Sequence, residues 1–241
     1  MSEAFIVAAA RTAGGRRGGP LSGWRPARPA PPGVAGVGRP ARGDPALVED
    51  VILGCVGQAG EQAANIARNA VLASSLPESV PGTSVDRQCG SSQQALHFAA
   101  QAVMSGAMDV VIAAGVESMT RVPMGMPMVL PAKNGLGFYV SPNMQKRYPG
   151  VEFSQFIGAE MVAKKYDLSK AQIDAYALLS HQRAIAATQA GRFEREIVPV
   201  QVRNAEGPQD AQHTVDEGIR FEASLEGIAG VKLLQEGGCI T

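Results

Sequence analysis

The chain has 241 residues, 45% of them hydrophobic, which is enough for one large domain or two smaller ones with a substantial core. Its 22 basic and 22 acidic side chains give a formal net charge of zero, so neither nucleic acid nor an anionic membrane surface is expected as a partner. No apolar run reaches the roughly 18 residues that a membrane-spanning helix needs, and the N-terminus lacks the basic stretch of a secretory signal, so a cytoplasmic location is expected.

Short apolar runs alternate with helical patterns over residues 1–118. Four runs have the length of strands, and runs of this kind are typical of a parallel sheet that is buried on both faces: residues 4–10, 51–56, 82–85 and 109–115. Helical spacing of apolar residues predicts helices over residues 63–76 and from Ala95 to about Ser105. The alternation predicts an α/β domain with a parallel sheet between layers of helices.

One segment departs from this alternation. Arg25–Gly43 reads RPARPAPPGVAGVGRPARG and contains no acidic residue. Such a composition cannot form a helix interior, because each proline removes a backbone donor and clashes with the preceding turn. The segment is predicted to be a flexible, partly polyproline-like linker, which is unusual inside an α/β domain.

The turn around Cys89 is the main candidate for chemistry. Cys89 stands between the strand-like run at residues 82–85 and the helical pattern that follows, so it falls at a helix N-terminus, where free N–H groups and the helix dipole favour a thiolate. An inert core cysteine is the alternative that spacing alone leaves open. Cys55 is interpreted as core packing. Three cysteines without CxxC spacing predict neither a disulfide framework nor a metal site.

After Ser118 the pattern changes, and residues 119–241 are predicted to form a second, mixed α+β domain. Residues 122–139 hold three methionines among glycines and prolines without helical or strand period, which fits either a pliable packed loop or a contact to a subunit or an acyl chain. Two helices and a short strand are expected later in this domain: residues 154–166, 170–190 and 197–202. The longer helix is expected to have Ser169 as its N-cap and Gly191 just past its end.

Four stretches carry a resemblance to a known family: AARTAGGRRGGPLSG at residues 9–23, VDRQCGSSQQAL at residues 85–96, DVVIAAGVESM at residues 109–119 and GRFEREIVPV at residues 191–200. In this order they resemble the thiolases, which are acyl-CoA acetyltransferases and 3-ketoacyl-CoA thiolases. The resemblance implies a subunit of two similar βαβαβ halves stacked in α-β-α-β-α layers, with an inserted loop domain that binds coenzyme A. Residues 1–118 resemble the first half, and residues 119–241 resemble the loop domain.

The resemblance also implies a mechanism and its residues. Cys89 is expected to attack the 3-keto carbon of a 3-ketoacyl-CoA and to release acetyl-CoA, after which free coenzyme A takes the acyl group; the condensation is the reverse. Coenzyme A is then a co-substrate, with no permanently bound cofactor and no metal. The DEGIR segment resembles the stretch whose arginine meets the nucleotide end of coenzyme A, which points to Arg220; an ordinary exposed ion pair is the alternative. The family further implies a homo-oligomer, either a dimer or a tetramer. The sequence around Cys89 is more similar to that of degradative members, of the β-oxidation type.

The first departure from the family is a set of missing motifs. The sequence holds no Gly-His-Pro motif and no second Cys-x-Gly motif, which in the family supply the histidine that activates the nucleophile and the cysteine that moves the α-proton. None of His97, His181 and His213 replaces them by motif, and Cys239 lies in a stretch, EGGCIT, that matches the end of the loop domain. A truncated, catalytically inactive chain with an uncovered apolar face is therefore the alternative to an active acyltransferase. A cysteine hydrolase with His97 or His181 as base has no supporting motif.

The second departure is Arg25–Gly43, which stands where the family has an amphipathic helix. Because the sequence on both sides fits without a change of length, we hypothesise that this segment is read in a shifted frame of a GC-rich gene. Translating the coding DNA in its other two frames tests the hypothesis. It is wrong if neither frame restores a helix with apolar periodicity.

Overall fold

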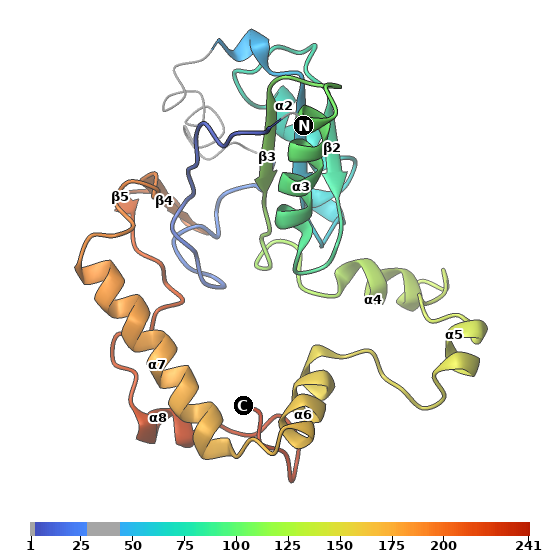
Figure 1. Cartoon of the computed structure of the whole chain (residues 1–241), viewed down its shortest axis with the longest axis vertical. Helices are drawn as coiled ribbons and strands as arrows, with labels where there is room; N and C mark the ends of the chain where they lie inside the picture. The colour runs from blue at the N-terminus through green and yellow to red at the C-terminus, as the bar shows by residue number, and fades with distance from the viewer. Residues whose placement is uncertain (1–2, 28–43) are drawn as a thin grey trace. The chain divides into compact units, whose positions relative to one another are not determined.

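The computed structural model describes residues 3–27 and 44–241 (Figure 1). The chain divides into two compact units, Met1–Gly137 with Arg195–Asp216, and Phe138–Glu194 with Glu217–Thr241. The domain boundary expected after Ser118 stays a prediction. Most of the expected linker, residues 28–43, lies outside the described residues.

The first unit is built on a three-stranded parallel sheet in the order β2–β1–β3. Its strands are β1 (Asp50–Gly54), β2 (Gly82–Val85) and β3 (Val111–Gly115). Gly54 pairs with Val85 on one side and with Gly115 on the other, so the three strands end in line. The parallel sheet confirms the predicted α/β fold class, and the loops that follow the strands all leave from one edge of the sheet.

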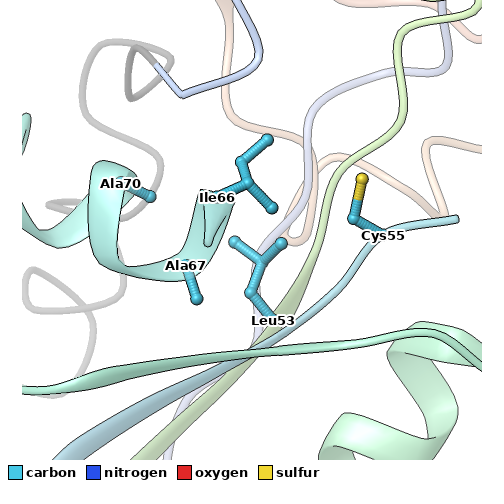
Figure 2. Close-up of a cluster of buried hydrophobic side chains, with 5 residues drawn as sticks. All are labelled: Leu53, Cys55, Ile66, Ala67 and Ala70. Atoms are coloured by element: carbon cyan, nitrogen blue, oxygen red, sulfur yellow. The ribbon is translucent and has the colours of Figure 1, made fainter. Parts of the chain in front are cut away.

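Alternate residues of β1 face helices on opposite sides of the sheet. Leu53 and Cys55 pack against α2 (Ile66–Leu72), as Figure 2 shows. Ile52 belongs to the cluster that packs against α3 (Ser91–Met104) on the other face. Because strand side chains alternate between faces, one fully buried strand serves both layers, and burying a side chain such as Leu53 contributes roughly 1.5–3 kcal/mol.

The prediction of a strand at residues 4–10 is wrong. This segment belongs to no strand, and Phe5, Ile6 and Val7 are each more than 70% exposed. Only its continuation pairs, where Arg11 forms a single parallel bridge with Ile197. An apolar run indicates a preference for burial, yet β1 already bonds to a strand on each side, and among the described residues no strand pairs with residues 4–10.

The methionine-rich segment at residues 122–139 contains a helix that its pattern did not predict. α4 (Met126–Lys133) begins after Gly125, whose φ of +83° is in the left-handed region, and has a proline in its first turn. Its residues are apolar nearly all round, from Met126 to Ala132, so no alternation of apolar and polar faces was available to reveal the helix. Met128, Val129 and Leu130 are exposed.

The remaining described elements are the 3-10 helices η1 (Pro45–Leu47) and η2 (Gly60–Gln62), the strands β4 (Val200–Asn204) and β5 (Gly207–His213), and the helices α5 (Pro142–Arg147), α6 (Gln155–Lys165), α7 (Lys170–Gln189) and α8 (Leu225–Ala229). β4 and β5 form an antiparallel hairpin. Its first strand begins at Val200, three residues later than the strand expected at residues 197–202. Across residues 3–27 and 44–241, no helix combines the length and the apolar character needed to cross a membrane.

The predicted limits of the long helix are confirmed. Ser169 and Gln172 form a reciprocal capping box at the start of α7, in which each side chain accepts from the other residue's backbone. Gly191, with a φ of +67°, follows the last turn, where a side chain would be strained.

Arg11 ties the N-terminal segment to the chain that returns after residue 195. Its guanidinium donates to both carboxylate oxygens of Asp216 at 2.7 and 3.0 Å, and its Nε donates to Glu196 Oε1 at 2.6 Å. The N–H of Gly14 donates to the same Asp216 carboxylate at 2.6 Å. The Arg11 hydrogen bonds are the main cause that lowers the pKa of Asp216 below its usual value, with the Gly14 N–H adding to the effect against the opposing cost of burial.

We predict that Asp216→Asn destabilises the chain by about 1–2 kcal/mol at pH 7, because charge-assisted hydrogen bonds to Arg11 are lost. A carboxyl group with a lowered folded-state pKa stabilises the fold above its unfolded pKa of about 4 and loses that contribution as the pH falls through its folded pKa. The difference in the free energy of unfolding between the variant and the unchanged chain should therefore disappear in acid. Urea unfolding, followed by the fluorescence of Trp24 in the same unit, measures it. A gap that is absent at pH 7, or that persists unchanged in acid, contradicts the assignment.

Candidate active site

Cys89 lies in the turn between β2 and α3, at the edge of the sheet where all three strands end. Its side chain is exposed, whereas that of Cys55 is buried and that of Cys239 is partly buried. The strand-to-helix position predicted from the sequence is therefore confirmed. In parallel α/β folds, ligands bind at this carboxyl edge, because the loops that carry functional side chains converge there.

The turn that carries Cys89 is held by hydrogen bonds from two side chains. Ser91 Oγ accepts from the N–H of Arg87 at 3.0 Å and donates to the carbonyl of Gln88 at 2.6 Å. Asp86 Oδ1 accepts from the N–H of Gln88 at 2.8 Å. Gln88 has a φ of +48°, a conformation that costs free energy for a residue with a side chain. The hydrogen bonds on each side hold Gln88 in this conformation. The backbone direction at Gln88 in turn sets the position of Cys89, the next residue.

The first turn of α3 supplies the electrostatic setting of Cys89. Gly90 is the N-cap residue and gives the helix no side-chain cap. The positive end of the helix dipole therefore meets no capping oxygen from Gly90, and it favours negative charge on a nearby sulfur or oxygen atom. An exposed cysteine at such a position can serve as a nucleophile, and the adjoining backbone can stabilise an oxyanion.

Two glycines allow the start of α3 to pack closely against the ends of two strands. A Cβ on Gly54 would lie 2.3 Å from the backbone N of Ser92, and a Cβ on Gly115 would lie 2.5 Å from the Cβ of Ser92. Cβ atoms do not come this close to other heavy atoms in real structures, so a side chain at the end of β1 or β3 would force its neighbours to shift. Sequence reasoning missed both residues, although a glycine that closes an apolar strand run is a signal of close backbone approach.

A second network joins the loops that follow β1 and β3. The Glu117 carboxylate accepts from the N–H of Val56 at 2.8 Å and from Nε2 of Gln62 at 2.8 Å, while Gln62 Oε1 accepts from the N–H of Ser118 at 2.8 Å. Gln62 is fully buried. This network was also missed, because a single glutamine between loops carries no periodic signal. It fixes the two loops beside the turn of Cys89.

The environment of Cys55 is unlike that of Cys89. Burial raises the pKa of the Cys55 thiol to about 12, and the nearby charges of Glu117 and Asp86 add to the increase. Cys55 therefore remains a neutral packing residue of the α2 cluster, as the sequence indicated.

The three histidines lie on three different elements. His97 is exposed on α3, His181 lies half-buried on α7, and His213 is buried at the end of β5. Within the described ranges, no hydrogen bond joins any of them to Cys89, so the structure gives no support to a cysteine hydrolase.

Arg220 lies in the second unit, in the segment between β5 and α8. Its side chain is exposed, and its guanidinium makes no ion pair with any described residue. Its backbone N–H donates to Nδ1 of His181 at 3.2 Å. Cys89 belongs to the first unit.

Sequence comparisons relate the chain to known proteins. The model of the family described as "Thiolase, N-terminal domain" matches residues 4–241. The chain is 46% identical to a steroid 3-ketoacyl-CoA thiolase of Mycobacterium tuberculosis, and the match covers 100% of this chain and 58% of that protein. It is 40% identical to a beta-ketoadipyl-CoA thiolase of Escherichia coli, with 96% of this chain and 60% of that protein covered.

A solved structure shows the same similarity. The crystal structure of the Bacillus anthracis acetyl-CoA acetyltransferase superimposes with a TM-score of 0.84 and 29% sequence identity, over 100% of this chain and 61% of that chain. The chain therefore spans about three fifths of the length of the relatives named here, judged by the shares of 58%, 60% and 61%.

We predict that Gly54→Ala destabilises the first unit by about 3 kcal/mol, because the new methyl group must displace backbone of α3 rather than a flexible side chain. Gly14→Ala is the matched control in the same unit, since its Cβ would lie 3.5 Å from the nearest atom, an ordinary contact. The control should change the free energy of unfolding by less than about 0.5 kcal/mol. Urea unfolding of both variants measures the difference, and equal stabilities contradict the close approach of α3.

Proposed function

The chain belongs to the thiolase family, and we propose that it carries the nucleophile of an acyl-CoA C-acyltransferase, with Cys89 as that nucleophile. The Cys89 sulfur attacks the 3-keto carbon of a 3-ketoacyl-CoA, and the bond between the α-carbon and the 3-keto carbon breaks. The α-carbon takes a proton and leaves as acetyl-CoA, while the shortened acyl group stays on Cys89 as a thioester. The thiol of a second coenzyme A then takes the acyl group, and the same steps in reverse give the condensation.

One observation carries this proposal: Cys89 is the exposed cysteine at the helix N-terminus on the carboxyl edge of the sheet. An attacking thiolate and the oxyanion that follows both carry negative charge, and the start of α3 favours negative charge at this position. The names of the two relatives, a steroid 3-ketoacyl-CoA thiolase and a beta-ketoadipyl-CoA thiolase, support the substrate class.

Coenzyme A is proposed as co-substrate, held in part by Arg220. An exposed guanidinium without an ion pair among the described residues is available to pair with a phosphate or to stack on an adenine ring. This fits the coenzyme A role better than the alternative of a surface ion pair. We also propose residues 1–118 as the domain of the nucleophile, residues 119–241 as the coenzyme A-binding loop domain, and a homo-oligomer as the state of the whole protein.

A second candidate function is a chain that accepts an acyl group without turning it over. The observation that favours it is the setting of Cys89, which in the described part of the chain has no hydrogen bond to a histidine or a carboxylate. In this candidate, the base that the family's mechanism needs is not supplied by these residues.

One experiment separates the two candidates. The 241-residue chain is incubated with acetoacetyl-CoA and coenzyme A, acetyl-CoA is measured over time, and the mass of the Cys89 peptide is followed. Continued formation of acetyl-CoA that Cys89→Ser abolishes supports the acyltransferase. An acetyl group on Cys89 without continued product formation supports the second candidate. If Cys89 gains no acyl group and no acetyl-CoA forms, both are wrong.

A further inference from the structure

The backbone at Arg220 rests on a histidine of the long helix. His181 lies near the middle of α7, and its Nδ1 accepts the N–H of Arg220 at 3.2 Å. On the other side of Arg220, its carbonyl accepts the N–H of Ala223 at 3.0 Å. The segment between β5 and α8 is otherwise irregular, so this side-chain contact anchors it at Arg220 to a regular element.

His181 projects from the middle of a regular helix. His181 lies on the more covered face of the helix, which also carries Asp174, Ala177, Ala184 and Thr188 at spacings of three or four residues. α7 is a capped helix of 20 residues, so the backbone that carries His181 is part of a regular element. Because Nδ1 accepts a hydrogen bond, the neutral ring carries its proton on Nε2.

We propose that His181 is a positioning residue for coenzyme A binding and acts by holding the backbone of Arg220. The proposal rests on the proposed function, in which Arg220 contacts coenzyme A. A long arginine side chain loses conformational freedom when it binds a ligand, and a mobile backbone beneath it adds to that loss. Holding the Arg220 backbone against α7 before the ligand arrives reduces this cost.

The hydrogen bond is suited to a role in binding and not in stability. It is exposed to solvent, so the Arg220 N–H can bond to water when the acceptor is removed, and the fold loses little free energy. The conformational freedom of the segment increases, however. The entropy cost of ordering the segment then reduces the affinity for a ligand. His181 substitutions should therefore weaken coenzyme A binding more than they lower the melting temperature.

The test compares substitutions that differ in one property. His181→Phe keeps the size of the ring and has no acceptor, and His181→Gln keeps polarity but places its amide near the position of Nε2. His181→Asn presents its amide oxygen near the position of Nδ1 and keeps the acceptor. Gln182→Ala, at the exposed neighbouring position of α7, is the matched control. Calorimetric titration with coenzyme A and thermal unfolding are measured for each.

We expect His181→Phe and His181→Gln to weaken coenzyme A binding about five- to tenfold, the effect of one poorly ordered side chain. His181→Asn and Gln182→Ala should stay within about twofold of the unchanged chain. In a chain that already carries Arg220→Ala, the His181 substitutions should have no further effect, because the two residues act through one contact.

The outcomes separate this inference from the proposed function. If the unchanged chain binds no coenzyme A, or if Arg220→Ala leaves binding unchanged, the coenzyme A role of Arg220 is wrong. If Arg220→Ala weakens binding while His181→Phe and His181→Gln do not, the role of His181 is overturned and that of Arg220 stands. Weak binding by His181→Asn, or a further loss in the Arg220→Ala chain, also overturns the positioning role.

Discussion

The close approach of α3 to the ends of β1 and β3 is the constraint on which the candidate active site depends. Gly54 and Gly115 stand opposite each other in register; Gly54 makes room for the backbone at Ser92, and Gly115 makes room for the Ser92 side chain. A side chain at either position would push the helix away from the sheet. Since Cys89 is three residues before Ser92, the direction of its side chain is set by how α3 rests on these strand ends. We therefore expect the glycines to affect the proposed chemistry through the position of α3.

The same edge of the sheet is made rigid by polar groups that the chain brings from distant positions. Glu117 and the buried Gln62 join the loops after β3 and β1, and Ser91 closes the turn between β2 and α3. Further out, the bidentate contact of Arg11 with Asp216 closes the first unit around the returning chain. A nucleophile is effective only when its supporting residues hold it in place. Among the described residues, these supports are hydrogen bonds to backbone, one hydrogen bond between the side chains of Gln62 and Glu117, and the ion pair of Arg11 with Asp216.

How much could be predicted from the sequence depends on how local each signal is. Continuous apolar runs and helical spacing predicted the parallel sheet, and Ser169 as an N-cap predicted the start of α7. The run at residues 4–10 misled, because apolar character shows a preference for burial and does not identify the partner. α4 was missed because an apolar residue at nearly every position leaves no periodicity. Gly54, Gly115 and Gln62 were missed since their roles arise from contacts between segments far apart in the sequence. The position of Cys89 was predictable because both the strand and the helix beside it carry local patterns.

We infer that the packing of α3 on Gly54 and Gly115 orients Cys89 for acyl transfer. The most direct measurement is the rate at which acetyl-CoA acetylates Cys89, determined by peptide mass spectrometry for the unchanged chain and for Gly54→Ala under conditions where both are folded. We expect the variant to be acetylated at least about tenfold more slowly, because small displacements of a nucleophile reduce reaction rates strongly. Equal rates of acetylation in the two folded chains would contradict it.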